Sequence, residues 1–567
     1  MKVVLLAINA KYIHSSLSVW ILAESVYKYA RTSHDVSVIE VTINQDNKYI
    51  ADSVAAHRPD VLGVSTYIWN AGKLPALLEQ LREKLPGTII VLGGPEASYN
   101  PEYWFENGAD YVLPGEGEYR FPSLLDEIGE GKPAGKTQKL PNKTAEGDPG
   151  LKSVQFRPEQ IAPEEPVDPY SDAYFAALNG RISYLEASRG CPFECSFCLS
   201  AGVPVRYFPI DIVKRQINKL SHSGTQTIKL VDRTFNCNAE RAYELFDYII
   251  RLDTECRFHF EVAADLFDEK TLTLLALAPP GRIQLETGLQ SFHKPALDAS
   301  SRYIKIGIAI KNIAALLQAR NIHIHADLIA GLPHETLKEF KESFNKAYAL
   351  GAHTLQLGFL KLLHGSVMRE QAETLEIHYT PQPPYEITSS PWMTKDDIKF
   401  LKQTENALQH TYNKRRFLSA LKYVITASGS DPFTFYGLLG ATVPNHGIQL
   451  EEYIEKIYAF CVGLPGVDSS YLRDCMKCDW LSMVKGKNTP PFMKNRDSRT
   501  NRDSKIDRDS LKKQNCRRGY IETEAEKRLG HKLGRQEYAV LTTGKVVFVD
   551  SNDRDPVTGL YKIYLVG

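Results

Sequence analysis

Two series of short apolar runs, each separated by helix-length amphipathic stretches, constrain the fold of this chain most strongly. The first series lies at residues 3–8, 36–41, 61–66, 88–92 and 111–113. Five such strands separated by helices predict a Rossmann-like parallel α/β domain over residues 1–130. Ligands of such sheets bind in the loops beyond the carboxyl ends of the strands.

Those loops, at residues 9–14, 65–70, 93–96 and 114–118, combine flexible backbone with polar groups. They supply the candidate ligand-binding residues of this domain. The candidates are Asn9, Ser65, Thr66, Gly93, Gly94, Pro95, Glu96, Gly115, Glu116 and Gly117.

The second series predicts a full or partial (β/α) barrel. Its six strands favour a partial (β/α)6 barrel over residues 181–380. Its expected strands are residues 182–186, 227–231, 258–262, 283–286, 322–329 and 354–360. Residues 131–180, rich in Pro, Glu and Lys around residues 131–172, are interpreted as a linker.

Residues 381–567 are expected to form a mainly helical domain with a small terminal β-unit. The clearest helical stretches are 394–412 and 450–462, and alternation returns at 538–549 and 561–566. Residues 485–514 repeat Arg-Asp-Ser three times and are interpreted as a solvated, mobile insertion.

Composition excludes several classes of protein. Hydrophobic residues make 43% and charged residues 24% of the 567 residues, which argues against a wholly disordered or fibrous chain. Lys plus Arg (68) equals Asp plus Glu (68), so no global field attracts nucleic acid or an anionic membrane. Apolar runs are too short to cross a bilayer, and the N-terminal run lacks a convincing cleavage site. We therefore expect a cytoplasmic protein.

The most specific motif is Cys191-x3-Cys195-x2-Cys198, which directly follows the first strand of the second series. Three thiolates on one short loop can hold three irons of a four-iron cluster and leave the fourth iron open to another ligand. A zinc loop is the alternative, but a structural zinc site normally needs a fourth protein ligand. The three cysteines are therefore the candidate catalytic and metal-binding residues.

In these residues the chain resembles the radical S-adenosylmethionine (SAM) enzymes, which carry this cysteine spacing after the first barrel strand. The resemblance implies a [4Fe-4S] cluster whose open iron binds SAM, and reductive cleavage of SAM to a 5′-deoxyadenosyl radical. Phe197 matches an aromatic residue that the family often places near the adenine.

Four further candidates for contact with SAM or substrate follow in barrel order. Asp232 ends the second strand, where the family usually has a Gly-Gly-Glu turn that this chain lacks. Glu261 and Glu286 resemble polar positions on the third and fourth strands, with rim salt bridges as the alternative. Gly331 lies in a segment, residues 327–335, that resembles the motif lining the adenine pocket.

A Rossmann-like domain before such a barrel resembles the cobalamin-binding subclass of these enzymes. By this resemblance the glycine-containing loops hold the corrin and its nucleotide tail, with Ser65 and Thr66 contributing. The chain lacks the Asp-x-His-x-x-Gly motif that supplies a cobalt ligand in carriers of the methionine synthase type. His14 could reach the cobalt, although an ordinary hydrogen-bonding role is the alternative.

The C-terminal region resembles an uncharacterised subgroup of these proteins, which supplies no substrate. Cys475 and Cys478, expected on a helix over residues 471–483, are interpreted as free thiols; a second metal site with Cys461 and Cys516 is the alternative. The domain over residues 1–130 has no cysteine, which argues against the enzymes that attach methylthio groups to transfer RNA.

The sequence therefore predicts a cobalamin-dependent radical SAM enzyme, most simply a methyltransferase that acts on an unactivated carbon. A cobalamin-bearing cyclase, isomerase or ring-modifying oxidase is the runner-up, and a noncatalytic cobalamin or redox sensor is the alternative from another class. The expected partners are a small-molecule or peptide substrate and an electron donor such as a flavodoxin or ferredoxin, with neither membrane nor nucleic acid.

Overall fold

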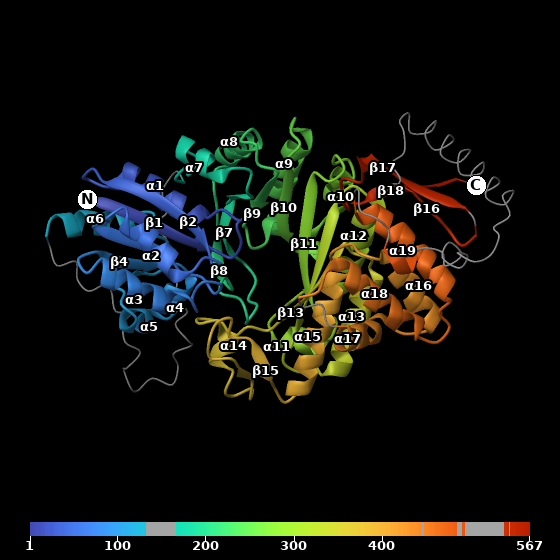
Figure 1. The fold of residues 1–567 in the computed structure, drawn as a ribbon. Helices are drawn as coiled ribbons and strands as arrows, with labels where there is room; N and C mark the ends of the chain where they lie inside the picture. The colour runs from blue at the N-terminus through green and yellow to red at the C-terminus, as the bar shows by residue number, and fades with distance from the viewer. Residues whose placement is uncertain (132–165, 444–446, 485–489, 494–537, 544, 567) are drawn as a thin grey trace, which may run out of the picture.

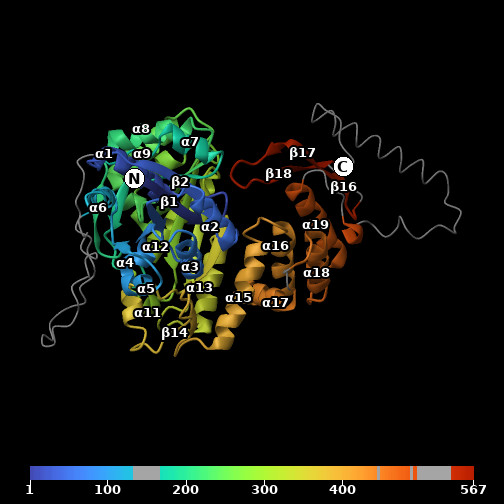
Figure 2. The same ribbon diagram turned by 60° about the vertical axis from the view of Figure 1, so that its left-hand side comes forward.

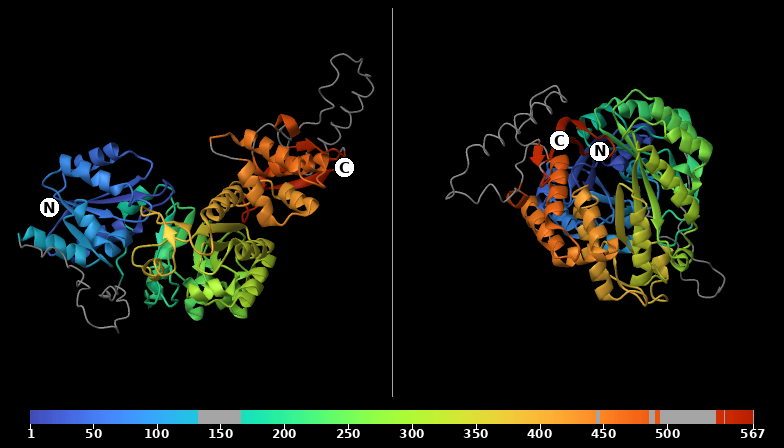
Figure 3. Two further views of the ribbon diagram at one scale, coloured as in Figure 1. Left: turned by 90° about the horizontal axis from the view of Figure 1, so that it is seen from below. Right: turned by 90° about the vertical axis from the view of Figure 1, so that its right-hand side faces the viewer.

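The computed structural model describes residues 1–131, 166–443, 447–484, 490–493, 538–543 and 545–566. The predicted insertion at residues 485–514 and most of the predicted linker lie outside these residues, apart from 490–493 and the linker's two ends. Figure 1 shows the N-terminal sheet at one end, the six-stranded sheet in the centre and the C-terminal helices at the other end. The left view of Figure 3 shows the same order, whereas in Figure 2 the N-terminal domain overlaps the barrel and the C-terminal helices lie to the right.

The N-terminal domain is a five-stranded parallel sheet in the order β2-β1-β3-β4-β5, with helices on both faces. Its strands are β1 (Lys2–Asn9), β2 (Asp35–Thr42), β3 (Val61–Ser65), β4 (Ile89–Gly93) and β5 (Tyr111–Leu113). Its helices are α1 (Leu17–Tyr29), α2 (Asn47–Ala55), α3 (Leu74–Lys84), α4 (Pro95–Tyr99), α5 (Pro101–Glu106) and α6 (Arg120–Gly129).

Strand β1 is apolar on both faces because both faces are covered. Val3, Leu5 and Ala7 belong to the apolar cluster that includes α1 and α6. The alternate residues Val4, Leu6 and Ile8 belong to the cluster that includes α2 and α3. A strand buried on both faces is expected at the centre of a parallel sheet.

The central domain is a six-stranded parallel sheet in the order β13-β12-β11-β10-β9-β6, which forms a partial barrel. Its strands are β6 (Ser183–Leu185), β9 (Thr227–Leu230), β10 (Arg257–Val262), β11 (Ile283–Gln290), β12 (His323–Ala330) and β13 (Thr354–Phe359). The helices are α7 (Asp172–Leu178), α8 (Ile210–Ser221), α9 (Ala239–Arg251), α10 (Glu269–Leu275), α11 (Lys294–Ala299), α12 (Ile306–Ala319) and α13 (Leu337–Ala349), with 3-10 turns η1 (Phe235–Cys237) and η2 (Ala264–Leu266). An antiparallel hairpin, β7 (Ser188–Cys191) and β8 (Val203–Tyr207), follows β6.

Strand β11 alternates between a buried face and a more exposed face. In β11, Ile283, Leu285 and Leu289 are buried in the main apolar core, whereas Gln284 and Glu286 on the other face line a cavity. Since side chains of a strand alternate, the apolar face packs under the helices and the polar face points into the barrel.

The C-terminal part is mainly helical and ends in a three-stranded antiparallel sheet. Its elements are α14 (Val367–Glu370), β14 (His378–Tyr379), β15 (Ile387–Ser389), α15 (Lys395–His410), α16 (Leu418–Ser428), α17 (Pro432–Thr442), α18 (Leu450–Val462), α19 (Ser469–Met483), η3 (Pro491–Met493), β16 (Tyr538–Val540), β17 (Val546–Arg554) and β18 (Tyr561–Val566). Cys475 and Cys478 lie on α19, as expected. None of the helices in the described ranges is long and apolar enough to cross a membrane.

The predicted fold class, an α/β chain with a Rossmann-like domain, a partial barrel and a helical C-terminal part, is confirmed. The two sheets are joined where the loop after β1 meets β6. His14 forms a parallel β-bridge with Ile182, and Ser15 Oγ donates a hydrogen bond of 2.7 Å to the carbonyl of Ile182. Beside them, Arg181 pairs with Glu40 at 3.0 Å, and both side chains are less than a tenth exposed.

We expect Glu40→Ala to lower the free energy of unfolding by about 3–5 kcal/mol, because it leaves the buried guanidinium of Arg181 without its counter-charge. The Glu40 carboxylate also accepts hydrogen bonds from Asn9 Nδ2 and Trp20 Nε1. Denaturant unfolding followed by tryptophan fluorescence measures the change. Glu79→Ala, an exposed carboxylate on α3, is the control and should change stability by less than about 0.5 kcal/mol. Equal effects of the two substitutions would contradict the role of the ion pair.

Candidate functional site

The three motif cysteines lie on the hairpin β7–β8 and the loop between its strands. Cys191 ends β7; it and Cys195 are buried, and Cys198 is half-buried. Each thiol lies near one polar group. The Thr234 hydroxyl is 3.6 Å from Cys191 Sγ, Arg302 Nη1 donates to Cys195 Sγ at 3.7 Å, and the Ser200 amide donates to Cys198 Sγ at 3.4 Å. Burial raises the pKa of the Cys195 thiol, and the Arg302 charge opposes that rise.

This donor set fits a cubic iron-sulfur cluster better than a single ion. Within the described residues, no three His, Cys, Asp or Glu side chains are arranged to hold one metal ion. In a four-iron cluster each cysteine binds a different iron, so the thiols need not converge on one point. The Arg302 N–H beside Cys195 stabilises the thiolate form that binds iron.

Asp232 supports the strand that leads into the cysteine loop. Its Oδ2 accepts a hydrogen bond from the Ala187 amide at 3.0 Å, and its Oδ1 accepts one from Ser188 Oγ at 2.5 Å. Burial raises the pKa of this carboxyl to about 6. The structure thus places Asp232 under the hairpin, and it does not line the large cavity.

A cavity of about 1140 Å³ lies between the carboxyl end of the N-terminal sheet and the interior of the partial barrel. It contains most of the candidate residues and reaches the cysteine hairpin at Ser188, Arg189, Gly190, Leu199 and Ser200. The predicted residues that line it are Asn9, Ser65, Gly93, Gly94, Pro95, Glu96, Gly115, Glu116, Gly117, Glu261 and Glu286. Thr66, the three cysteines, Phe197, Asp232 and Gly331 are not among its lining residues.

Thr66 braces the loops instead of lining the cavity. Its hydroxyl donates to the Gly93 carbonyl at 2.7 Å and accepts from the Ala97 amide at 2.9 Å. Gly94 has φ +101°, and a Cβ there would lie 2.5 Å from the Thr66 carbonyl oxygen. Glycine is therefore required where the β3 and β4 loops touch, and its missing side chain leaves the backbone open to a ligand.

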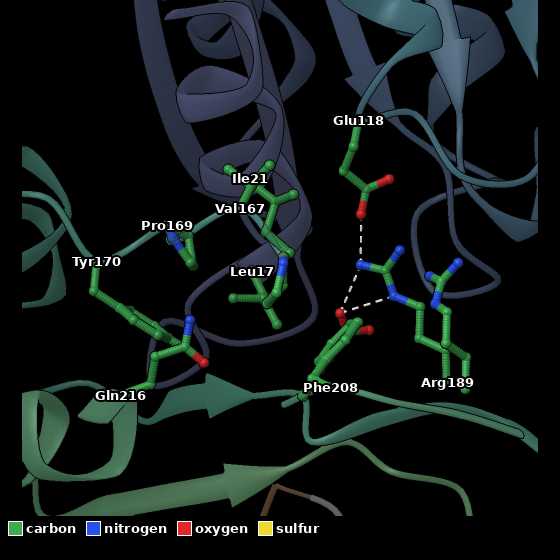
Figure 4. A pocket seen from close by; sticks show the side chains of 12 residues that line it. Leu17, Ile21, Glu118, Val167, Pro169, Tyr170, Arg189, Phe208 and Gln216 are labelled. Carbon is green, nitrogen blue, oxygen red and sulfur yellow. Dashed lines mark hydrogen bonds and ion pairs between the residues drawn. The ribbon is translucent and has the colours of Figure 1, made fainter. Parts of the chain in front are cut away.

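Two predicted cofactor-binding carboxylates already have protein partners. Glu116 pairs with Arg206 at 2.8 Å and with Arg189 at 3.0 Å. The same Arg189 guanidinium reaches Glu118 at 2.5 Å (Figure 4). Glu96 Oε2 accepts a hydrogen bond from the Tyr385 hydroxyl at 2.8 Å, and burial raises the Glu96 pKa. These carboxylates hold the site together across the domain boundary, whatever they contact in a ligand.

The barrel wall of the cavity carries charged residues that the sequence analysis missed. Lys229 Nζ lies 3.7 Å from Glu261 Oε1 and 3.6 Å from Glu286 Oε2, and His259 Nε2 lies 2.9 Å from Glu286 Oε2. Burial opposes ionisation of Glu286, but the His259 hydrogen bond and Lys229 prevail and lower its pKa to about 2. His325 is the neighbour of Glu286 in the β11–β12 register and also lines the cavity. Polar residues at alternate positions of the strands were the signal that could have revealed this wall.

His14 also lines the cavity, and its Nδ1 lies 2.5 Å from the Tyr184 hydroxyl. Burial, followed by the charge of Lys11, lowers the pKa of His14. His14 therefore has the Tyr184 hydroxyl as a hydrogen-bond partner of Nδ1. Any contact with a ligand would be made by its other ring nitrogen, Nε2.

Comparison with protein families gives three matches along the chain. The B12 binding domain matches residues 3–125, the Radical SAM superfamily matches residues 185–347, and the Protein of unknown function (DUF4080) matches residues 373–542. The chain thus carries a B12-binding domain followed by a Radical SAM domain. It carries the uncharacterised DUF4080 domain as its C-terminal part, and the resemblance inferred from the sequence is confirmed.

Over the aligned residues, curated relatives are about a quarter identical to this chain. The cobalamin-dependent radical SAM methyltransferase TokK of Streptomyces tokunonensis is 24% identical over 331 residues, which cover 54% of this chain and 46% of TokK. The hopanoid C-3 methylase of Methylococcus capsulatus is 23% identical over 312 residues, covering 54% of this chain and 59% of the methylase. This chain thus spans about half the length of the curated relatives it matches.

Two solved structures share the fold. The radical SAM methyltransferase TsrM from Kitasatospora setae has a TM-score of 0.54 at 20% identity, covering 67% of this chain and 77% of TsrM. The cobalamin-dependent radical enzyme OxsB has a TM-score of 0.53 at 14% identity, covering 84% of this chain and 78% of OxsB. The cofactors follow from the matched domains. The B12 binding domain binds cobalamin, and the Radical SAM domain binds a [4Fe-4S] cluster and SAM.

We expect Gly94→Ala to reduce the cobalt bound per chain several-fold, because the new methyl group would overlap the Thr66 carbonyl and φ +101° is strained for alanine. Metal analysis after growth with cobalamin measures the loss. Gly72→Ala, where a Cβ would meet no atom within 4 Å, should bind cobalt as the wild type does. Unchanged cobalt in the Gly94 variant would contradict the assignment of this loop to cobalamin.

Proposed function

We propose that this protein is a cobalamin-dependent radical SAM enzyme that methylates an unactivated carbon of its substrate. The observation that carries the proposal is one cavity bounded on one side by the glycine-containing loops of the B12-binding domain. On the other side it is bounded by the charged barrel wall and the cysteine hairpin. Reacting groups held against one cavity are already in proximity, which supplies much of the rate enhancement of a group transfer.

When bound, the cluster and SAM supply a carbon-centred radical, and cobalamin supplies a transferable methyl group. The residues of this chain hold and orient these groups. Cys191, Cys195 and Cys198 bind the cluster, and Phe197, which packs against the core beside them, shields it. The loops at Ser65, Gly93–Gly94 and Gly115–Gly117 receive cobalamin.

The barrel wall contacts SAM or the substrate. Glu261 and Glu286 line the cavity with Lys229 and His259, and their charges are partly balanced within the wall. A half-buried polar wall whose side chains already hold one another in place orients a polar ligand without reorganisation. Asp232 and Gly331 support the site without lining the cavity. Asp232 fixes the hairpin, and Gly331, at φ +90°, packs against Ile387.

A cobalamin-bearing cyclase is the second candidate, because one matched relative is the anaerobic magnesium-protoporphyrin IX monomethyl ester cyclase of Rubrivivax gelatinosus, at 22% identity over 352 residues. Methyl transfer is preferred because several matched relatives are named as methyltransferases or methylases. We propose a small-molecule or peptide substrate, and a flavodoxin or ferredoxin as electron donor in the reducing cytoplasm.

The function is tested by anaerobic purification from cobalamin-supplied cells, followed by metal analysis and incubation with SAM and a reductant. About four irons and one cobalt per chain, together with 5′-deoxyadenosine, are expected. Iron and 5′-deoxyadenosine without cobalt would contradict cobalamin dependence. Failure of SAM to perturb the paramagnetic resonance spectrum of the reduced cluster would instead favour a noncatalytic sensor.

We expect Cys195→Ala to abolish cluster assembly and all 5′-deoxyadenosine formation while cobalt binding continues, because the cysteine hairpin and the cobalamin loops belong to different domains. Iron analysis and chromatography of the reaction measure these effects. Cys475→Ala on α19 is the matched control and should keep both metals. Retained 5′-deoxyadenosine formation in the Cys195 variant would refute the ligand assignment.

A further inference from the structure

The groups beside the three motif cysteines differ in charge. The Thr234 hydroxyl at Cys191 and the Ser200 amide at Cys198 are neutral, whereas the Arg302 guanidinium at Cys195 carries a full positive charge. The Thr234 hydroxyl donates its single hydrogen to the Arg233 carbonyl, 2.9 Å away, so this hydrogen is not free for Cys191. Arg302 is therefore the strongest electrostatic influence among these three groups.

Arg302 is held in place by several independent contacts. Its Nη2 donates to the Gly288 carbonyl at the end of β11 at 2.6 Å, and its backbone amide donates to the Leu297 carbonyl at 2.8 Å. Its guanidinium lies 6.0 Å from the centre of the Phe193 ring in the cysteine loop. The preceding Ser301 has φ +51°, a left-handed conformation that turns the chain after α11. These contacts fix the guanidinium beside Cys195.

The cysteine loop itself is tied to the same segment. The Ser196 amide donates to the Ser300 carbonyl at 2.9 Å, two residues before Arg302. Cys195 is 6% exposed, and the Nε of Arg302 is buried with no hydrogen-bond partner among the described residues. The contact between charge and sulfur is therefore partly buried, and an electrostatic interaction there is stronger than it would be in bulk water.

A positive charge and an N–H···S hydrogen bond stabilise the more negative of two redox states. Hydrogen bonds to the sulfurs and local charge are among the factors that set the reduction potential of an iron-sulfur cluster. A cluster gains one electron on reduction and no bond is made or broken. An external donor of the flavodoxin or ferredoxin class supplies that electron.

We propose that Arg302 is a positioning residue that raises the reduction potential of the cluster through its contact with Cys195. This inference rests on the proposed function only in requiring that the three cysteines bind a cluster. The effect on the reduction potential is measured in the protein without SAM. It is therefore distinguished from the effect of any contact between Arg302 and SAM.

The test is a redox titration of the full-length, cluster-loaded protein without SAM, followed by paramagnetic resonance of the reduced cluster. The variants are Arg302→Gln, Arg302→Lys and Thr234→Val, each accepted only with wild-type iron content. We expect the Gln variant to have a more negative midpoint potential than the wild type, and the Lys variant to lie between them. Thr234→Val, which removes a neutral group from Cys191, should shift the potential less than Arg302→Gln.

A Gln variant that keeps the wild-type potential with a full cluster would overturn the proposal, as would an equal shift in Thr234→Val. If the Arg302→Gln variant fails to assemble a cluster, the Arg302→Lys variant provides the test. A midpoint potential of the Lys variant at or above that of the wild type would overturn the proposal. A wild-type protein without iron would instead overturn the proposed function together with this inference.

Discussion

The site depends on the ion pairs that hold the N-terminal sheet against the barrel domain. Arg181 pairs with Glu40, and Arg189 and Arg206 both pair with Glu116. Each arginine comes from the barrel side and each glutamate from the N-terminal domain. Charges this poorly exposed are costly to desolvate and gain little net stability, but they define one relative placement of the partners. That placement creates the cavity between the loops of the N-terminal sheet and the barrel.

The same cavity explains the polarity of the barrel interior. Lys229, His259, Glu261 and Glu286 face inward from β9, β10 and β11, at positions where a sealed barrel core would carry apolar side chains. Their mutual contacts partly compensate for their burial. A polar wall of this kind suits a ligand with hydrogen-bonding groups, because an apolar ligand would leave these groups without water and without partners.

Much of the fold could be predicted from the sequence, because strand periodicity and the cysteine spacing are local signals. Both parallel sheets and the loops that line the cavity follow from them. The roles of Asp232 and Thr66 could not be predicted, since each side chain bonds a backbone group on a segment distant in sequence. The pairing of Glu116 with Arg206 and the contact of Arg302 with Cys195 likewise join residues about 90 and 107 positions apart. Only the three-dimensional structure brings such partners together.

Both cofactors are expected to face one cavity, and a magnetic measurement of the distance between them would show whether they do. The protein is loaded with cobalamin and cluster, and both are poised in paramagnetic states, Co(II) and the one-electron-reduced cluster. Pulsed paramagnetic resonance then reports whether the two spins interact. If both cofactors face one cavity, the two spins show a clear dipolar interaction, and the cluster accelerates relaxation of the cobalt signal. Two signals that behave as if each centre were alone would contradict it.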